Sequence, residues 1–246
     1  MRDWTSELVV VDMESSDATL DIARSYGARI VQVPAAGWAE PGRQAGIDAA
    51  TQPWVLVLDA DERAAPGLRE LAARYVHRDD LGGVQLPRQN FQFGWWVPGA
   101  GTWPDWQLRL FRSDRTTWSG LRTHAGPTVN GRVEHAPAMV ENAIVHHSFA
   151  TIRDWMASAN SYTDLEAGRM AAGGRTPSLP RLLGVPLARF AQDYLVKRGY
   201  RGGRYGLAVG LLAMCYWLLA GLKAWESRLA TEQPTPDAVR EPTLTS

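Results

Sequence analysis

Short apolar runs alternate with helical patterns along the first part of the chain. The runs predict three buried strands, at residues 8–12, 29–33 and 54–58. Helices are predicted between them at residues 20–26 and 43–50, and the first of these ends at Gly27. Strands that alternate with helices favour an α/β fold with a mostly parallel sheet, whose ligand-binding edge lies at the carboxyl ends of the strands.

Further signals divide the rest of the chain. Strands are predicted at residues 84–88, 108–111 and 144–146, and helices at residues 66–75 and 151–170. Residues 173–186 are rich in Gly and Pro and predict a connector, whereas the polar residues 227–246 predict a disordered tail. We therefore expect an α/β domain at residues 1–150, a helical region at residues 151–226 and then this tail.

The strand at residues 54–58 is followed at once by three carboxylates, Asp59, Asp61 and Glu62. If the strand continues, Asp59 and Asp61 point to the same side, because side chains alternate along a strand. Two carboxylates there can hold a divalent cation and a phosphate ester, although a solvated strand end is the alternative. Asp12 ends another predicted parallel strand, so we expect it on the same sheet edge as Asp59.

Composition narrows the class of protein. The chain has 246 residues, of which 45% are hydrophobic and 11 are tryptophan, so it can bury a substantial core. Its formal net charge is zero, which gives no reason to expect a nucleic-acid partner. A single cysteine, Cys215, excludes an internal disulfide framework and fits a reducing compartment. Residues 1–7 lack the charged and then apolar pattern of a signal peptide.

Several segments, taken in order, resemble family 2 glycosyltransferases. Residues 9–19 (VVVDMESSDAT) are similar to the family's VVVDxxSxDxT strand and turn, and residues 42–47 (GRQAGI) to its xRNxGI segment. Residues 58–62 (LDADE) are similar to its DxD metal motif. Residues 88–90 (RQN) and 101–111 (GTWPDWQLRLF) resemble the acceptor-side block of the branch that adds sugars to the lipopolysaccharide core or related lipid-linked glycans.

This resemblance implies a GT-A fold, with a Rossmann-like, mostly parallel sheet and flanking helices, here followed by membrane-associated C-terminal helices. It also implies an inverting hexosyltransferase that uses Mn²⁺ or Mg²⁺. The implied donor is a nucleotide sugar, with UDP-hexose favoured by the family, and the implied acceptor is a lipid-linked glycan or lipopolysaccharide core. A phosphotransfer enzyme is the weaker alternative, because the sequence has neither a P-loop motif nor a G-x-G-x-x-G after a strand.

The resemblance also implies roles for single residues. Donor binding is implied for Asp12, Arg43 and Asp59, metal binding for Asp61, and the role of general base for Asp105. Ordinary structural roles remain open: Asp12 can cap the next helix, Arg43 can be a solvated helix residue, and Asp105 can cap a strand. The second candidate base is Glu62.

The acceptor side is assigned in the same way. Four residues are implied to bind the acceptor: Arg88, Asn90, Trp103 and Trp106. Indole rings can stack on sugar rings, although tryptophans in this stretch can equally form the core beneath a loop. His124 and His146 lie where the branch carries histidines, and either can add a metal ligand or be a packed residue.

The C-terminal region carries a membrane signal. Residues 205–222 contain no charge, a basic cluster at residues 197–204 precedes them, and Lys223 follows. A bilayer span usually needs ~20 apolar residues, and flanking cations favour an anionic lipid surface. A transmembrane helix, an interfacial helix and a helix packed on the catalytic domain all remain open. We expect peripheral or shallowly inserted association with the cytoplasmic face of the inner membrane.

The sequence departs from the family at three places. The family has another strand and helix before the block at Val9, and the present sequence has few residues there. We therefore expect an N-terminally shortened domain, with a start that lies upstream as the alternative. A non-catalytic, membrane-associated remnant is the alternative function. Gln44 stands where Asn is usual, and Ala125 follows His124 where the branch often has Glu.

Overall fold

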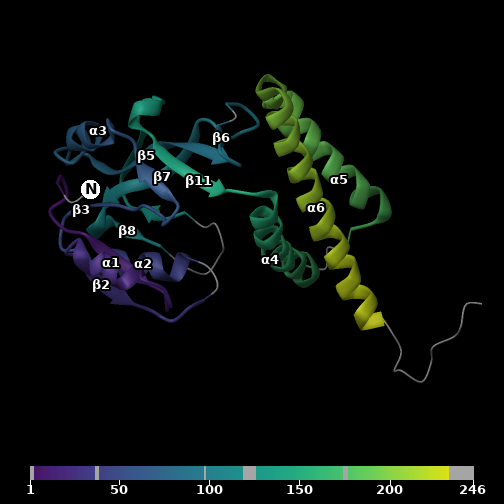
Figure 1. Ribbon diagram of the computed structural model, residues 1–246, viewed down its shortest axis with the longest axis horizontal. Helices are drawn as coiled ribbons and strands as arrows, with labels where there is room; N and C mark the ends of the chain where they lie inside the picture. Colours follow the sequence, from purple (N-terminus) through teal and green to yellow (C-terminus); the bar gives the residue numbers. More distant parts are fainter. Residues whose placement is uncertain (1–2, 37–38, 97, 119–125, 174–176, 233–246) are drawn as a thin grey trace, which may run out of the picture. The chain divides into compact units, whose positions relative to one another are not determined.

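The computed structural model describes residues 3–36, 39–96, 98–118, 126–173 and 177–232. The chain forms two compact units (Figure 1). The first, which we call the α/β unit, comprises Met1–Phe91 and Thr102–Ser148. The second, the helical unit, comprises Gln92–Gly101 and Phe149–Ser246.

The α/β unit begins with a two-stranded parallel sheet of β1 (Val9–Asp12) and β2 (Arg29–Gln32). Helix α1 (Thr19–Ser25) joins the two strands, and α2 (Glu40–Ala49) packs on β1. The packing is close, because a Cβ atom added at Gly46 would lie 2.9 Å from Cγ2 of Val11. These four elements confirm the strands and helices predicted in this part of the sequence.

The main sheet has the strand order β3 (Trp54–Leu56), β7 (Asp105–Arg112), β5 (Leu81–Gln92), β11 (Ile144–Phe149) and β4 (Glu62–Ala64). Strand β10 (Arg132–His135) pairs in parallel with β5. The pairs β3–β7, β5–β7 and β4–β11 are antiparallel, so the sheet is mixed. The α/β class is confirmed. The sequence pattern did not predict the short strands β4, β8, β9 and β10.

One expectation about the sheets was wrong. β1 pairs with β2 and β3 pairs with β7, so β1 and β3 belong to different sheets and do not share one edge. The order strand–helix–strand predicts the direction of successive strands but not which strands become hydrogen-bonded neighbours. Asp12 therefore ends a strand of one sheet, whereas Asp59 follows a strand of the other.

Two apolar clusters lie on the two sides of the main sheet. Helix α3 (Leu68–Tyr75) packs its Leu68 and Leu71 against Leu86 and Leu110. On the other side, Ile47 of α2 packs with Phe111 and Trp118. The small antiparallel pair β8 (Thr116–Thr117) and β9 (Thr128–Val129) and the 3₁₀ turns at Ser113–Arg115 and Val140–Asn142 complete this unit.

The helical unit consists of β6 (Trp95–Trp96), α4 (Ile152–Ala172), α5 (Leu179–Ala191) and α6 (Gly203–Glu232). A π turn (Gln192–Val196) and a 3₁₀ turn (Gly199–Gly202) connect α5 to α6. The prediction of α4 is confirmed, and it begins with a capping box in which Thr151 and Asp154 exchange hydrogen bonds.

Two predictions in this region were wrong. The expected connector at residues 173–186 contains the first half of α5, because Pro180 lies in the first turn, where no helical N–H is required, and Pro186 is tolerated inside the helix. The disordered tail was predicted to start at residue 227, but α6 continues to Glu232 and ends just before Pro234. Residues 233–246 lie outside the described part of the chain.

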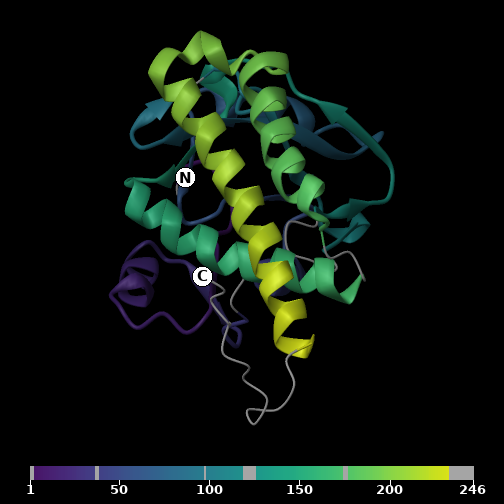
Figure 2. The ribbon, with the colours of Figure 1, turned by 90° about the vertical axis from the view of Figure 1, so that its right-hand side faces the viewer.

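Helices α5 and α6 form an antiparallel hairpin. Leu182 of α5 lies against Gly221 of α6, and Phe190 lies against Gly210, nearer the turn. Helix α4 packs on α6 as well, and Figure 2 shows it crossing behind the hairpin. Within the stretch from Gly199 to Leu229, an 18-residue window has a mean hydropathy of 1.8, so this helix is long and apolar enough by composition to cross a bilayer.

Candidate active site

A network of charged side chains crosses the α/β unit where β3, β5 and β7 meet the segment that follows β3. At one end, Arg43 of α2 donates to both carboxylate oxygens of Asp59 at 2.7 Å. Arg109 of β7 donates to the same carboxylate at 2.6 Å. The guanidinium groups of Arg43 and Arg109 both lie over the ring of Trp118, 4.8 and 5.9 Å from its centre. Two arginines therefore neutralise Asp59 from a shared aromatic platform.

The network continues through Glu62, whose side chain is fully buried. Glu62 accepts hydrogen bonds from Arg109 at 3.3 Å and Arg88 at 3.0 Å, and from the backbone N–H of Asp59 at 3.0 Å. These three donors engage the carboxylate of Glu62, so it is less available than Asp105 to accept a proton from an acceptor hydroxyl. Its role in the structure is to hold Arg88 and Arg109 in place.

Arg88 links Glu62 to Asp105. Nε and Nη2 of Arg88 donate to Oδ2 of Asp105 at 2.9 and 2.7 Å, and the side-chain amide of Asn90 donates to the same oxygen at 2.9 Å. Oδ1 of Asp105 accepts one hydrogen bond, from Gln107 at 2.8 Å. Each carboxylate oxygen can accept about two hydrogen bonds. Oδ1 is therefore the atom of Asp105 with capacity for a further proton.

Asn90 extends the network to His146 and Asp61. The amide nitrogen of Asn90 donates to Asp105 and to the carbonyl of Thr102. The amide oxygen of Asn90 therefore faces Nδ1 of His146 at 2.6 Å, and in this assignment Nδ1 carries the hydrogen. Nε2 of His146 lies 3.1 Å from Oδ2 of Asp61. Both ring nitrogens therefore face acceptor oxygens, and both contacts are hydrogen bonds only when the imidazole carries both hydrogens. Asp61 is the most exposed carboxylate of this network, with 48% of its side chain exposed.

The charges of the network control its pKa values. Burial raises the pKa of Asp59, but hydrogen bonds and charge from Arg109 and Arg43 outweigh it and lower the pKa to about 2. Burial likewise raises the pKa of Asp105, and the charge of Arg88 with the hydrogen bond from Asn90 more than reverses this. The hydrogen bond from His146 lowers the pKa of Asp61. All three carboxylates are therefore ionised at neutral pH.

Arg109 owes its position to a β-bulge. Val84 of β5 pairs with Leu110 and Gln85 pairs with Leu108, which leaves Arg109 without a partner. Such an extra residue turns its side chain away from the normal alternation, and Arg109 is 4% exposed and reaches both Asp59 and Glu62. Sequence reasoning did not select Arg109, because the bulge that places it depends on strand register.

The structure brings together six of the predicted site residues: Arg43, Asp59, Asp61, Arg88, Asn90 and Asp105. The alternation expected for Asp59 and Asp61 does not occur, because β3 ends at Leu56 and a turn closes from the carbonyl of Asp59 to the N–H of Glu62. Asp59 consequently faces the arginines, whereas Asp61 faces His146.

Three other predicted residues lie apart from this network. Trp106 follows Asp105 in β7 and thus projects from the opposite face of the strand, where its ring meets His135 edge-on at 4.7 Å. Trp103 is half-buried in the segment before β7. Asp12 is 2% exposed, and hydrogen bonds from Ser15 and Glu14 in the turn after β1 lower its pKa.

Asp12 nevertheless has an atom to offer a ligand. Its Oδ2 is buried and has no hydrogen-bond partner among the described residues. Its Oδ1 accepts from the backbone N–H of Ser15 at 3.2 Å, within the turn that follows β1. Helix α1 begins after Ala18 without a side-chain cap, so Asp12 does not cap the next helix.

Metal ligands are sparse in the described part of the site. Across the ranges that the structure describes, no three His, Cys, Asp or Glu side chains are grouped to hold a metal ion. Asp59 is already shared by two arginines, which leaves Asp61 as the accessible carboxylate. His124, the other predicted ligand, lies outside the described residues. One carboxylate fits a Mg²⁺ ion bound mainly by water and phosphate oxygens, but not an all-protein metal cage.

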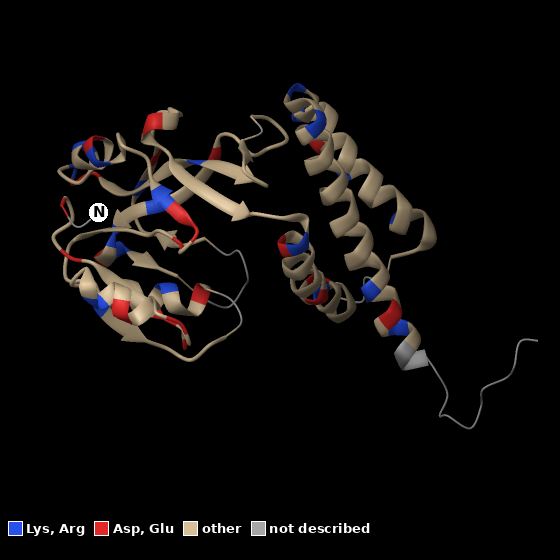
Figure 3. Ribbon diagram, viewed as in Figure 1, with Lys and Arg blue, Asp and Glu red and all other residues tan. Residues whose placement is uncertain are grey.

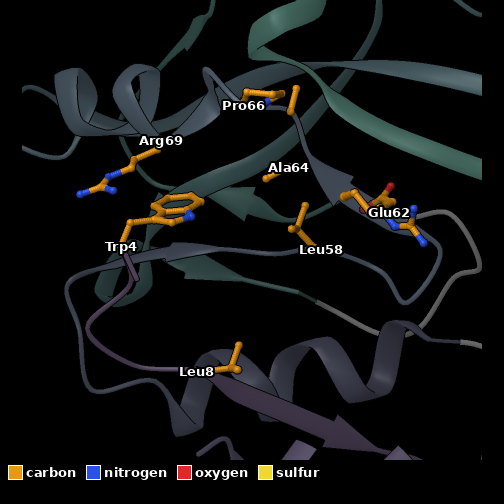
Figure 4. Close-up of a pocket in the computed structure, with 9 residues that line it drawn as sticks. Trp4, Leu8, Leu58, Glu62, Ala64, Pro66 and Arg69 are labelled. Carbon is orange, nitrogen blue, oxygen red and sulfur yellow. The ribbon is translucent and has the colours of Figure 1, made fainter. Parts of the chain in front are cut away.

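A separate pocket of about 510 Å³ opens beside β4 (Figure 4). Its walls are mostly apolar, from Trp4 and Leu8 on one side and Leu58, Ala64 and Pro66 on the other. Of the charged network, Glu62 alone lines it, and that carboxylate is engaged with the two arginines. The pocket therefore does not coincide with the predicted donor or acceptor residues.

The α/β class and the carboxylates at the end of β1 and after β3 fit a glycosyltransferase, and comparison with known proteins identifies the family. The family model "Glycosyl transferase family 2" matches residues 4–130, and the chain belongs to that family. The matched range contains Asp12, the Asp59–Glu62 segment and Asp105.

Individual relatives are similar over most of the chain. The lipopolysaccharide core biosynthesis glycosyltransferase LpsC of Rhizobium meliloti is 24% identical over 94% of this chain and 87% of its own length. The uncharacterized glycosyltransferase RP128 of Rickettsia prowazekii is 34% identical over 86% of this chain and 75% of its own length. Both alignments are much longer than the α/β unit alone, so the similarity includes the helical unit.

Proposed function

We propose that the protein is an inverting hexosyltransferase that transfers a sugar from a nucleotide sugar, UDP-hexose in the simplest case, to a lipid-linked glycan or lipopolysaccharide core. The observation that carries this is the hydrogen-bonded network from Arg43 to Asp61 in a chain that belongs to glycosyl transferase family 2. The similarity to LpsC supports the acceptor class. The site is proposed to act at the cytoplasmic face of the inner membrane, with the membrane surface as a partner.

In this mechanism the acceptor hydroxyl oxygen attacks the anomeric carbon of the donor sugar. The new C–O bond forms as the bond to the diphosphate breaks, so one displacement inverts the anomeric configuration. Oδ1 of Asp105, which accepts one hydrogen bond in the structure, takes the hydroxyl proton. Arg88 and Asn90 hold this carboxylate by three hydrogen bonds and keep it ionised before the reaction.

The donor side is assigned to Asp12, Arg43 and Asp59. The buried free oxygen of Asp12 is suited to accept an N–H of the nucleobase. Asp59, held by two arginines that keep it ionised, is assigned to the ribose side of the donor. Asp61 would hold Mg²⁺ or Mn²⁺, which supplies positive charge to the departing diphosphate. On the acceptor side, Trp103 and Trp106 remain candidates for stacking on sugar rings.

Calorimetric titration with UDP tests the donor site. The wild-type protein should bind UDP in the presence of Mn²⁺ and more weakly without it, and Asp61→Asn should abolish the metal-dependent part. Asp79→Asn is the matched control, because the Asp79 side chain is 98% exposed and lies outside the network. Absence of UDP binding by the wild type with either metal would refute the proposal and favour the non-catalytic alternative.

A further inference from the structure

The α5–α6 hairpin exposes apolar side chains along its whole length. The exposed side of α6, which we call the α6 stripe, consists of Leu207, Leu211, Cys215, Leu222, Trp225 and Leu229. Successive members are separated by three, four or seven residues, so they lie on one side of the helix. Helix α5 adds a second exposed row at four-residue spacing, formed by Leu179, Leu183 and Leu187.

The opposite side of α6 is covered within the helical unit. Gly210 and Gly221 lie against α5, and Ala220 and Ala224 are buried where α4 and α5 pack on the helix. The small residues allow the neighbouring helices to approach closely. The apolar residues on this side are thus accounted for by helix packing, whereas no element among the described residues covers the α6 stripe.

The turn of the hairpin is strongly basic. Lys197, Arg198, Arg201 and Arg204, which we call the basic tip, are all exposed, and no acidic residue interrupts them. Within the described chain, Lys197 pairs with Asp193, whereas none of the three arginines forms an ion pair with a carboxylate. The ribbon of α6 is blue near this tip and uncharged over its central length (Figure 3). Cations next to an apolar run favour an anionic lipid surface.

Trp95 and Ala100, from the segment that follows β5, contact the turn of the hairpin and the start of α6. The backbone N–H of Ala100 donates to the carbonyl of Lys197 at 2.9 Å, and the ring of Trp95 stacks on Tyr205 at 4.2 Å. Trp95 is 51% exposed beside these cations. Exposed Trp and Tyr rings next to basic residues are typical of the headgroup region of a bilayer.

The contacts of α4 argue against a spanning α6. Lys223 donates to Asp164 of α4 at 2.6 Å and to the carbonyl of Asn160 at 2.7 Å, which fastens α4 to the second half of α6. Asp164 is 61% exposed, and α4 also exposes Arg153. If α6 crossed a bilayer, it would carry these charges into the hydrocarbon, where they are costly.

We propose that the hairpin lies in the surface of an anionic bilayer. The α6 stripe enters the upper acyl region, the basic tip and Trp95 meet the lipid phosphates, and α4 stays on the water side. This inference deepens the membrane association in the proposed function by identifying the surface that binds and the lipid charge it requires. Three residues along the chain separate Gly101, in the segment that follows β5, from Asp105, so the segment that carries the candidate base starts at the lipid-binding tip.

Flotation of the full-length protein with lipid vesicles tests the charge requirement, without any nucleotide sugar. We expect binding to vesicles rich in phosphatidylglycerol, weak binding to pure phosphatidylcholine, and release by salt. The triple variant R198Q/R201Q/R204Q should bind about a hundredfold more weakly, at about fivefold per charge. R63Q/R69Q/R74Q, with the same change in net charge, should bind like the wild type. Equal binding to both lipids, or equal loss in both variants, would overturn the proposal.

Two further variants test the apolar contact. Leu211→Ser removes a member of the α6 stripe and should weaken vesicle binding. Leu165→Ser removes an equally exposed leucine from α4 and should leave binding unchanged, because α4 faces water. Equal effects of the two substitutions would contradict the predicted orientation of the helical unit.

Depth measurements distinguish the surface arrangement from a spanning helix. Cys215 is the single cysteine and lies midway along the α6 stripe, so it can carry one fluorophore. Spin-labelled lipids should quench this fluorophore most strongly when the label is near the headgroup. Strongest quenching by labels at the chain ends would indicate a spanning α6 and refute the inference. Neither outcome depends on UDP binding or sugar transfer, so failure here is separable from failure of the proposed function.

Discussion

The pairing of Asp59 with two arginines predicts a defined change of stability with pH. The pKa of Asp59 falls from 3.8 to about 2 in the folded protein. Between these values the unfolded chain binds more protons than the folded one, so stability falls as the pH falls. The contribution is fully present above about pH 4 and is lost by about pH 2, and the difference in pKa corresponds to about 2 kcal/mol. Partial solvent exposure of the side chain, 26%, makes this an upper figure.

Asp59→Asn isolates this contribution from other carboxylates that titrate in the same range. At neutral pH the variant should be less stable, because Arg43 and Arg109 lose a charged partner in a largely buried site. As the pH falls, Asp59 of the wild type becomes neutral, and the gap between the two proteins should shrink by about 2 kcal/mol. Urea unfolding at each pH can be monitored by pulsed hydrogen exchange. Peptides from β5 and β7 then report the free energy of unfolding of the α/β unit alone. A gap that stays constant from about pH 5 to about pH 2 would refute the reasoning.

Three other substitutions have definite expected outcomes. Asp105→Asn should lower kcat of sugar transfer by about 10²- to 10⁴-fold with little change in UDP affinity, and an equal loss in the exposed control Asp114→Asn would contradict this role. Leu86→Ala removes a fully buried side chain and should cost about 2–5 kcal/mol in urea unfolding; a loss below about 1 kcal/mol would mean that the core collapses around the gap. Thr151→Ala removes the capping box and should destabilise α4 by about 1 kcal/mol, with faster hydrogen exchange confined to its first turn.

Much of the fold could be predicted because its local signals are strong. The apolar runs at β1 and β3 and the amphipathic pattern of α4 each depend on residues close together in sequence. The two wrong predictions in the helical unit involve proline, whose effect depends on its position within a helix. Pro180 occupies a first turn and Pro186 lies inside α5, and composition alone does not distinguish these positions from a connector.

The candidate site was only partly predictable for a different reason. Asp59, Arg88 and Asp105 were selected individually from their place in recognisable segments, but the charged chain that joins them passes through Arg109 and Glu62. Arg109 enters through a register shift between β5 and β7, which no pattern along one strand reveals. Gln44, which departs from the family pattern, has a visible role in the fold: its side-chain oxygen accepts from the backbone N–H of Trp118 at 2.6 Å.

The docking of residues 92–101 on the hairpin turn has a consequence for how the chain is made. The segment leaves the ribosome between β5 and β7, yet its partners Lys197 and Tyr205 are synthesised about a hundred residues later. Strand β6 of this segment can pair with β5 as soon as both are made, whereas the contacts of Ala100 and Trp95 with the hairpin must wait for α6. A truncation at residue 150, although it follows the apparent domain boundary, would therefore leave the middle of the sequence incompletely folded.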